Sequence, residues 1–162
     1  MKRNRKRIVG ITLGVALCLS IGGISGFITR EAIPVWYASL NKPFFTPPNA
    51  WFGPVWSLLY VLMGVAAGWV WSMGSHHRWV LTALYHFTAQ LILNALWSIV
   101  FFGLKSPGIA LLVIVLLLYL IVRTIHWFSI VNKTTAILLY PYLAWVVFAS
   151  LLNASIVYLN TD

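Results

Sequence analysis

Long apolar runs separated by short polar stretches dominate this sequence. Five runs are nearly free of charged side chains, and they cover residues 8–28, 51–71, 79–103, 108–128 and 135–159. An α-helix needs about 20 such residues to cross roughly 30 Å of hydrocarbon. None of the runs alternates polar and apolar residues as the strands of a membrane barrel do. The pattern predicts an all-α integral membrane protein, a bundle of five transmembrane helices in a single domain over residues 8–159.

The composition agrees with a membrane location, and the position of the basic residues explains the net positive charge. The 162 residues are 61% hydrophobic and 8% charged, and the formal net charge is +9. Five of the eleven Lys and Arg residues lie in segment 1–7, just before the first apolar run. We interpret this segment as a basic N-terminus that attracts anionic membrane lipids, rather than as a nucleic-acid-binding arm. We expect no nucleic-acid partner.

The distribution of basic residues predicts an orientation. Eight Lys and Arg residues fall on the N-terminal side of the predicted bundle, whereas Arg30, Lys42 and Lys105 fall on the other side. Basic residues concentrate in cytoplasmic segments of membrane proteins. We therefore predict a cytoplasmic N-terminus and, from the basic N-terminus and the short length of the chain, a bacterial plasma (inner) membrane location.

The segment 29–50 is rich in proline and aromatic residues. Its prolines are Pro34, Pro43, Pro47 and Pro48. Because proline fixes its own φ and restricts the residue before it, we expect a stiff, non-helical loop. The aromatic content argues against disorder. We predict a lid or binding wall, with Trp36, Tyr37, Lys42 and Pro47 as its ligand-binding residues.

In three of the apolar runs, aromatic, polar or small residues recur every three or four positions and so lie on one face of the predicted helix. These residues are Trp56 and Tyr60 in run 51–71, His86, Gln90, Asn94 and Trp97 in run 79–103, and Tyr142, Trp145, Ala149 and Asn153 in run 135–159. Buried polar groups need partners, so the polar stripe should face the bundle interior. It forms either hydrogen bonds between helices or the wall of a pocket. Pro141 should kink the last helix.

Small residues recur one turn apart in the first run, at Gly10 and Gly14 and again at Gly22 and Gly26. Such pairs let another helix backbone approach closely. We expect them to form the contact of a homodimer. The alternative is that these glycines are merely tolerated in a membrane helix.

Catalytic and metal-binding residue sets are missing from the sequence. Glu31 and Asp162 are the only acidic residues, and both lie outside the predicted spans, so an intramembrane proton relay has no carboxylate. The four histidines and Cys18 lack ligand spacing, so we expect no metal site and no required cofactor. What remains is a concave aromatic surface suited to a large, flat, apolar ligand.

Several motifs together resemble the TspO/MBR family of tryptophan-rich sensory and translocator proteins. The resembling elements are Trp36-Tyr37 with Leu40 and Lys42-Pro43, Pro47-Pro48, Trp56 with Leu59-Tyr60 and Met63-Gly64, Gln90 with Asn94, Trp97 and Phe101-Phe102-Gly103, and Pro141-Tyr142 with Trp145, Ala149 and Leu152-Asn153. They occur in the family's order over nearly the whole chain after the first run. Two departures are Ala38, where many members have an acidic residue, and the C-terminus, which lacks the Arg of the animal sterol motif.

The resemblance implies a function. Family members are five-helix bundles, often homodimers, that bind porphyrins such as protoporphyrin IX between the loop and helices two, three and five. We therefore expect a membrane receptor or sensor with porphyrin as its ligand. The alternatives are a light-dependent porphyrin-degrading enzyme, for which the resemblance implies Trp56 and Trp145 as catalytic residues, and a carrier for porphyrin or lipid.

Overall fold

The computed structural model describes residues 2–161, with side chains from Asn4 to Thr161. The side chains of Lys2 and Arg3, in the basic segment predicted over residues 1–7, lie outside the described residues. The described residues form helices joined by turns and short connections. Five of the helical segments are long and apolar enough to cross a membrane. This confirms the predicted bundle of five transmembrane helices.

The described chain contains eight helical elements. In chain order they are α1 (Lys2–Ala32), the π-helical turn η1 (Ile33–Tyr37), α2 (Asn49–Ser72), α3 (Arg78–Ser98), the π-helical turn η2 (Ile99–Gly103), α4 (Pro107–Val131), α5 (Lys133–Ile137) and α6 (Tyr140–Leu159). The last span is interrupted between α5 and α6, just before Pro141, where the sequence predicts a kink. Proline lacks the N–H that a continuous helix would need there.

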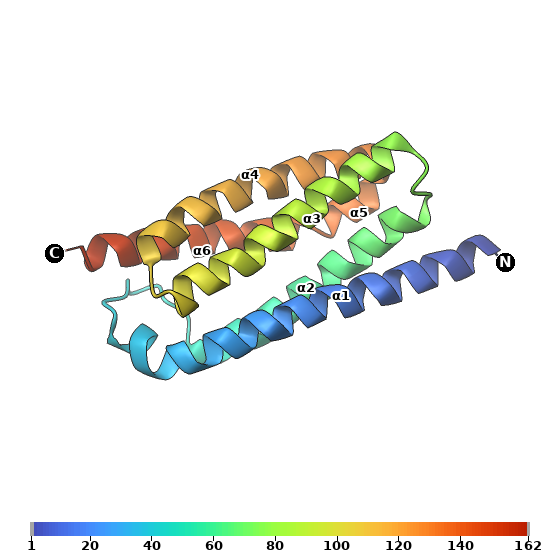
Figure 1. The fold of residues 1–162 in the computed structure, drawn as a ribbon. Helices are drawn as coiled ribbons and strands as arrows, with labels where there is room; N and C mark the ends of the chain where they lie inside the picture. The colour runs from blue at the N-terminus through green and yellow to red at the C-terminus, as the bar shows by residue number, and fades with distance from the viewer. Residues whose placement is uncertain (1, 162) are drawn as a thin grey trace.

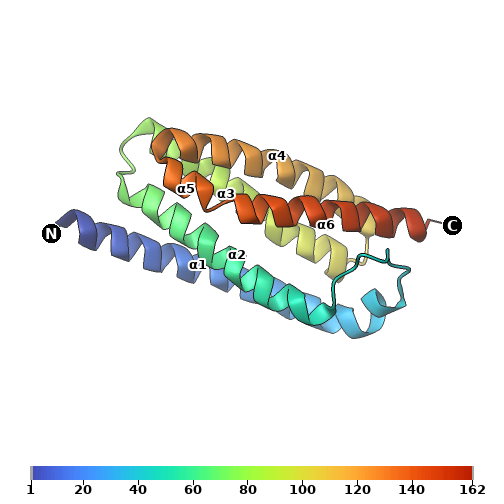
Figure 2. The ribbon, with the colours of Figure 1, turned by 180° about the vertical axis from the view of Figure 1, so that it is seen from behind.

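The helices form two groups that face each other. In Figures 1 and 2, α1 and α2 run side by side as an antiparallel pair, while α3, α4, α5 and α6 form the other group. The two chain ends lie at opposite ends of the bundle, as an odd number of spans requires (Figure 1). Asn132 caps α5 by accepting a hydrogen bond from the Thr134 backbone N–H at 2.9 Å.

Glycines hold α1 and α2 together. A Cβ added at Gly10 would lie 2.5 Å from the carbonyl oxygen of Gly68, and one added at Gly14 would overlap the carbonyl oxygen of Gly64. Only glycine allows the backbones to approach this closely. The expectation that Gly10 and Gly14 form a homodimer contact is therefore wrong for this structure, because α2 of the same chain occupies that face.

The expected loop over residues 29–50 is wrong in its first part. The helical path continues beyond Ala32 through η1, and the non-helical connection covers only residues 40–48. Pro34 lies inside this continuous helical path, where its missing N–H leaves a carbonyl of the preceding turn without its usual donor, and the path passes this point as the wider π-helical turn η1. Trp36 and Tyr37 consequently stand on a helical turn, so their direction is set by α1 rather than by a free loop.

The connection that remains is tied to the rest of the bundle. The Lys42 ammonium group donates to the carbonyl oxygens of Tyr37, Ala38 and Leu40, at 2.8, 3.2 and 2.9 Å. Lys42 thereby satisfies carbonyls that the end of the helical path leaves free. Asn160, just after α6, donates to the Asn41 carbonyl oxygen at 2.9 Å. The connection is thus fixed at both the α1 end and the α6 end.

Candidate functional site

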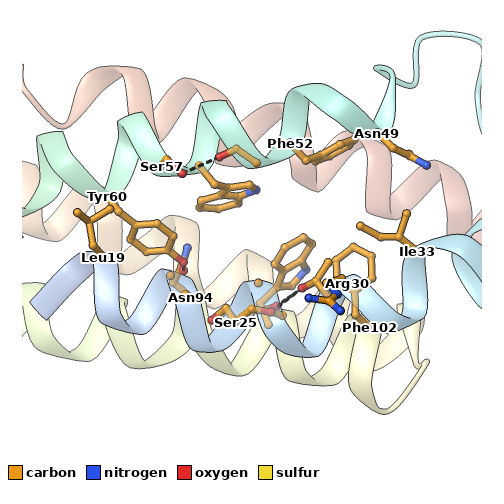
Figure 3. A pocket seen from close by; sticks show the side chains of 18 of the residues that line it. Leu19, Ser25, Arg30, Ile33, Asn49, Phe52, Ser57, Tyr60, Asn94 and Phe102 are labelled. Carbon is orange, nitrogen blue, oxygen red and sulfur yellow. Dashed lines mark hydrogen bonds between the residues drawn. The ribbon is translucent and has the colours of Figure 1, made fainter. Parts of the chain in front are cut away.

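A cavity of about 720 Å³ lies between α1, α2 and α3. Figure 3 shows Phe52 and Ser57 of α2 on one side of it and Ser25 and Arg30 of α1 on the other. The turns η1 and η2 contribute to its wall as well. It falls in the size range of about 300–1,000 Å³ that is typical of small-molecule pockets.

Glycines of α1 make room for the cavity. A Cβ added at Gly23 or Gly26 would meet no atom within 4 Å, whereas one added at Gly22 would lie 2.5 Å from the ring of Tyr60. All three glycines line the cavity. The absence of side chains along this stretch of α1 leaves space opposite α2.

Aromatic residues of α2 form the opposite wall. Phe52, Trp56 and Tyr60 recur every four residues, which places them on one face of the helix. The ring centroid of Trp56 lies 5.7 Å from that of Tyr60 and 6.4 Å from that of Trp97 on α3. These separations are those of interacting aromatic pairs. The wall therefore offers flat aromatic surface to a ligand.

A hydrogen-bonded network closes the inner side of the cavity. Tyr60 Oη donates to Asn94 Oδ1 at 2.5 Å, and Asn94 Nδ2 donates to Tyr142 Oη at 3.1 Å. Tyr142 Oη in turn donates to Gln90 Oε1 at 2.8 Å. Gln90 is only 1% exposed and lines neither cavity described here, and its role is to join α3 to α6 through this hydrogen bond. Asn94 has two roles, because it hydrogen-bonds two tyrosines and also lines the cavity.

A second, much smaller cavity of about 20 Å³ lies toward α6. Trp145, Ala149 and Asn153 of α6 line it. Asn153 Oδ1 accepts a hydrogen bond from Trp97 Nε1 at 3.1 Å, which joins α6 to α3. Five residues line both cavities and so stand between them: Tyr37, Phe52, Trp56, Trp97 and Phe102.

The larger cavity opens on the α1 and α2 side of the bundle. Its lining residues on α3, such as Asn94 and Trp97, are buried. By contrast, Gly23 and Gly26 on α1 and Gly53 on α2 are exposed. An opening of this kind between two transmembrane helices faces the surrounding lipid.

The predicted ligand-binding residues divide into three groups. Tyr37, Trp56, Tyr60, Asn94 and Trp97 line the larger cavity, and Trp145, Ala149 and Asn153 line the smaller one. The residues that line neither are Trp36, Lys42, Pro47, Gln90 and Tyr142. Among these, Trp36 packs against Phe101, at 5.6 Å between ring centroids, and the Lys42 ammonium group serves the backbone.

Sequence reasoning missed the contribution of α1. It placed the pocket between the loop and the second, third and fifth spans, whereas α1 supplies a full wall that includes Ser25, Thr29 and Arg30. The signal for this wall was the cluster Gly22, Gly23 and Gly26, of which the sequence analysis considered only Gly22 and Gly26, as a contact between helices. Phe52 and Phe102 were also missed, although both stand beside predicted residues.

The fold and the cavity define a class: a polytopic helical membrane protein whose spans enclose an aromatic cavity open to the bilayer. A family model described as the TspO/MBR family matches residues 14–159. The chain is 41% identical over 153 residues to a protein named tryptophan-rich protein TspO from Archaeoglobus fulgidus, covering 94% of this chain and 98% of that protein. It is 38% identical over 147 residues to the human translocator protein, covering 90% and 85% of the two chains. The chain belongs to the TspO/MBR family.

Proposed function

We propose that this protein is a membrane receptor or sensor that binds protoporphyrin IX and similar flat, apolar ligands in the larger cavity. The cavity itself carries the proposal: about 720 Å³ is enclosed on two sides by the rings of Phe52, Trp56 and Trp97. Planar aromatic ligands stack on such rings and bury a large apolar area against them. Polar groups such as Asn94 fix the orientation of a ligand with few polar atoms.

The opening between α1 and α2 would let a lipid-soluble ligand enter the cavity from the bilayer, because the exposed glycines that line the cavity lie on that side. Protoporphyrin IX is a ligand of this type, since its large apolar ring partitions into membranes. A sensory role agrees with the name of a relative from Cereibacter sphaeroides, the tryptophan-rich sensory protein, which is 36% identical over 125 residues.

We also propose a bacterial plasma membrane location with the N-terminus in the cytoplasm. The N-terminal part of α1, which includes Arg5, Lys6 and Arg7, lies at the same end of the bundle as the first residues of α3 and α5, Arg78 and Lys133 (Figure 1). The opposite end carries fewer basic residues. The positive-inside rule places the more basic end in the cytoplasm. The cavity mouth near Arg30 would then lie toward the outer face.

A titration of intrinsic tryptophan fluorescence with protoporphyrin IX in detergent tests the binding. The decisive variant is Gly26→Phe, because the new ring fills open space in the cavity without meeting another atom at its Cβ. The matched control is Ile24→Phe, which adds the same ring at a position 65% exposed on the same helix and outside the cavity lining. We expect saturable quenching in wild type and Ile24→Phe and at least tenfold weaker binding in Gly26→Phe. Equal affinities in all three proteins would exclude this cavity as the binding site.

A second candidate function is light- and oxygen-dependent breakdown of the bound porphyrin. The observation that favours it is the position of Trp56, which lines both cavities. Trp145 lines the smaller cavity, and its indole N–H has no hydrogen-bond partner among the described residues. Loss of the porphyrin absorption band under illumination, over several turnovers per protein, would support this activity. It should stop in Trp56→Phe or Trp145→Phe, while saturable binding in the dark persists. A stable absorption band in wild type would leave binding alone as the function.

A further inference from the structure

Arg30 is the only charged residue among the residues described here that line the larger cavity. It lies in the last turn of α1, just after the apolar run 8–28, and its side chain is exposed. Figure 3 shows it at one end of the cavity, near Phe102 and Ile33. The cavity therefore combines an aromatic interior with a positively charged mouth.

Lys42, a basic residue in the connection after η1, does not compete with Arg30 for an anionic ligand. The Lys42 ammonium group donates to three backbone carbonyl oxygens, so its hydrogen-bonding capacity is used within the chain. Of the two acidic residues in the sequence, only Glu31 is among the described residues. Glu31 does not line the cavity, and neighbouring positions on a helix point about 100° apart. No carboxylate of the described lining residues therefore neutralises the guanidinium group.

Further polar groups gather at the same end of the cavity. Thr29 Oγ1 and Ser98 Oγ share a hydrogen bond at 3.1 Å, and both residues line the cavity. Asn49, in the first turn of α2, faces the cavity across from Arg30 (Figure 3). The free N–H groups of that first turn add positive potential. Tyr37, only 3% exposed, also lines the cavity and has a hydroxyl group with no hydrogen-bond partner among the described residues.

We propose that the ligand of this cavity is an anionic amphiphile, with a flat apolar body against Trp56 and Trp97 and a carboxylate paired with Arg30. This inference deepens the proposed function and rests on it, because it specifies what a porphyrin must carry to bind well. An arginine guanidinium binds a carboxylate with two parallel hydrogen bonds. A carboxylate at the mouth also remains close to water, so burial of the aromatic body costs no burial of the charge.

A simpler role for Arg30 is to interact with the negative end of the α1 dipole and with water. The two roles make different predictions for ligands that differ only in charge. A pairing role affects acids and spares their esters. A structural role changes the affinities for both kinds of ligand equally.

The experiment titrates wild type, Arg30→Gln, Arg30→Lys and Lys105→Gln with protoporphyrin IX and with its dimethyl ester. Lys105 is the matched control, since it is exposed in the turn before α4, at the same end of the bundle, and does not line the cavity. We expect Arg30→Gln to weaken binding of the diacid by roughly fivefold to tenfold and to leave the diester unchanged. Arg30→Lys should bind the diacid with an affinity between those of wild type and Arg30→Gln, because lysine keeps the positive charge but cannot form two parallel hydrogen bonds. Lys105→Gln should retain the full affinity.

Three results would overturn the pairing: an equal loss for acid and ester, no loss for either, or the same loss in Lys105→Gln. If wild type binds neither porphyrin saturably, the proposed porphyrin function fails, and 1-pyrenebutyric acid with its methyl ester then decides the inference separately. Weaker binding of the pyrene acid alone in Arg30→Gln would uphold the anionic amphiphile. Absent or Arg30-independent binding of the pyrene acid would overturn it.

Discussion

The glycine contact between α1 and α2 predicts that the same substitution has opposite effects at two positions of one helix. At Gly14, an added Cβ would overlap the carbonyl oxygen of Gly64 and lie 3.1 Å from the Gly68 nitrogen. At Gly26, the same methyl group would meet nothing within 4 Å. Because both changes are Gly→Ala in α1, the gain in helix propensity cancels in the comparison.

The size of the difference follows from the geometry. Relief of the overlap at Gly14 requires the two backbones to separate by about 1 Å, and a gap of that size forfeits a quarter to a half of each dispersion contact along the seam. Overpacking of this kind costs about 2 kcal/mol. For a chain of this length, about 2 kcal/mol corresponds to a difference of roughly 4–8 °C in melting temperature.

Thermal unfolding of the two variants in the same detergent, followed by circular dichroism, measures this difference. We expect Gly14→Ala to melt below wild type and Gly26→Ala to melt at or slightly above it. Equal melting temperatures for the two variants would refute the claim that α1 and α2 pack backbone to backbone at Gly14.

Three further predictions concern the polar network, the connection and the tryptophans. Asn94→Leu should lower the free energy of unfolding by about 1–3 kcal/mol, because Tyr60 Oη loses its buried acceptor; thermal unfolding checks this, and an unchanged melting temperature would contradict it. Lys42→Met should cost about 1 kcal/mol of stability by freeing three carbonyls, yet leave porphyrin affinity within twofold of wild type, as fluorescence titration would show. Trp56→Ala should weaken porphyrin binding more than Trp145→Ala does, because Trp145 lines only the smaller cavity; the reverse order in titrations would place the ligand near α6.

The five spans could be predicted from the sequence because the bilayer imposes a length. Each apolar run had to be long enough to cross the hydrocarbon, and polar turns such as Ser75-His76-His77-Arg78 separate them. The interruption before Pro141 was equally predictable, since a missing N–H acts locally. Properties that depend on one segment at a time were therefore accessible.

The prolines of residues 29–50 were less informative about where the first helical path ends. Pro34 does not end the helical path, which widens into the π-helical turn η1 around it and continues to residue 39. Whether a proline stops a helix or starts a turn depends on which N–H groups the surrounding backbone needs. That depends on neighbours distant in sequence, here Phe101 and Phe102 packed against Trp36 and Tyr37.

The polar stripe of α3 shows a similar division. Its periodicity predicted that Gln90 and Asn94 face the interior, and both are buried. The periodicity could not decide between a helix contact and a pocket wall, because both place an amide on the inner face. The surroundings decide: Gln90 accepts a hydrogen bond from Tyr142 and lines neither described cavity, whereas Asn94 lines the larger cavity, where α1 leaves space.

The glycines of α1 explain why that space exists. From Gly14 to Gly26 the nearest atoms change from the backbone of α2 at Gly14, to the ring of Tyr60 at Gly22, and then to no atom within 4 Å. The glycines are similar throughout, but the α2 residues change from Gly64 and Gly68 to the aromatic series that includes Trp56. Small residues opposite small residues bring two backbones together, whereas small residues opposite large rings leave a cavity lined by those rings. One helix pair therefore provides both the most closely packed seam of the bundle and its candidate binding site.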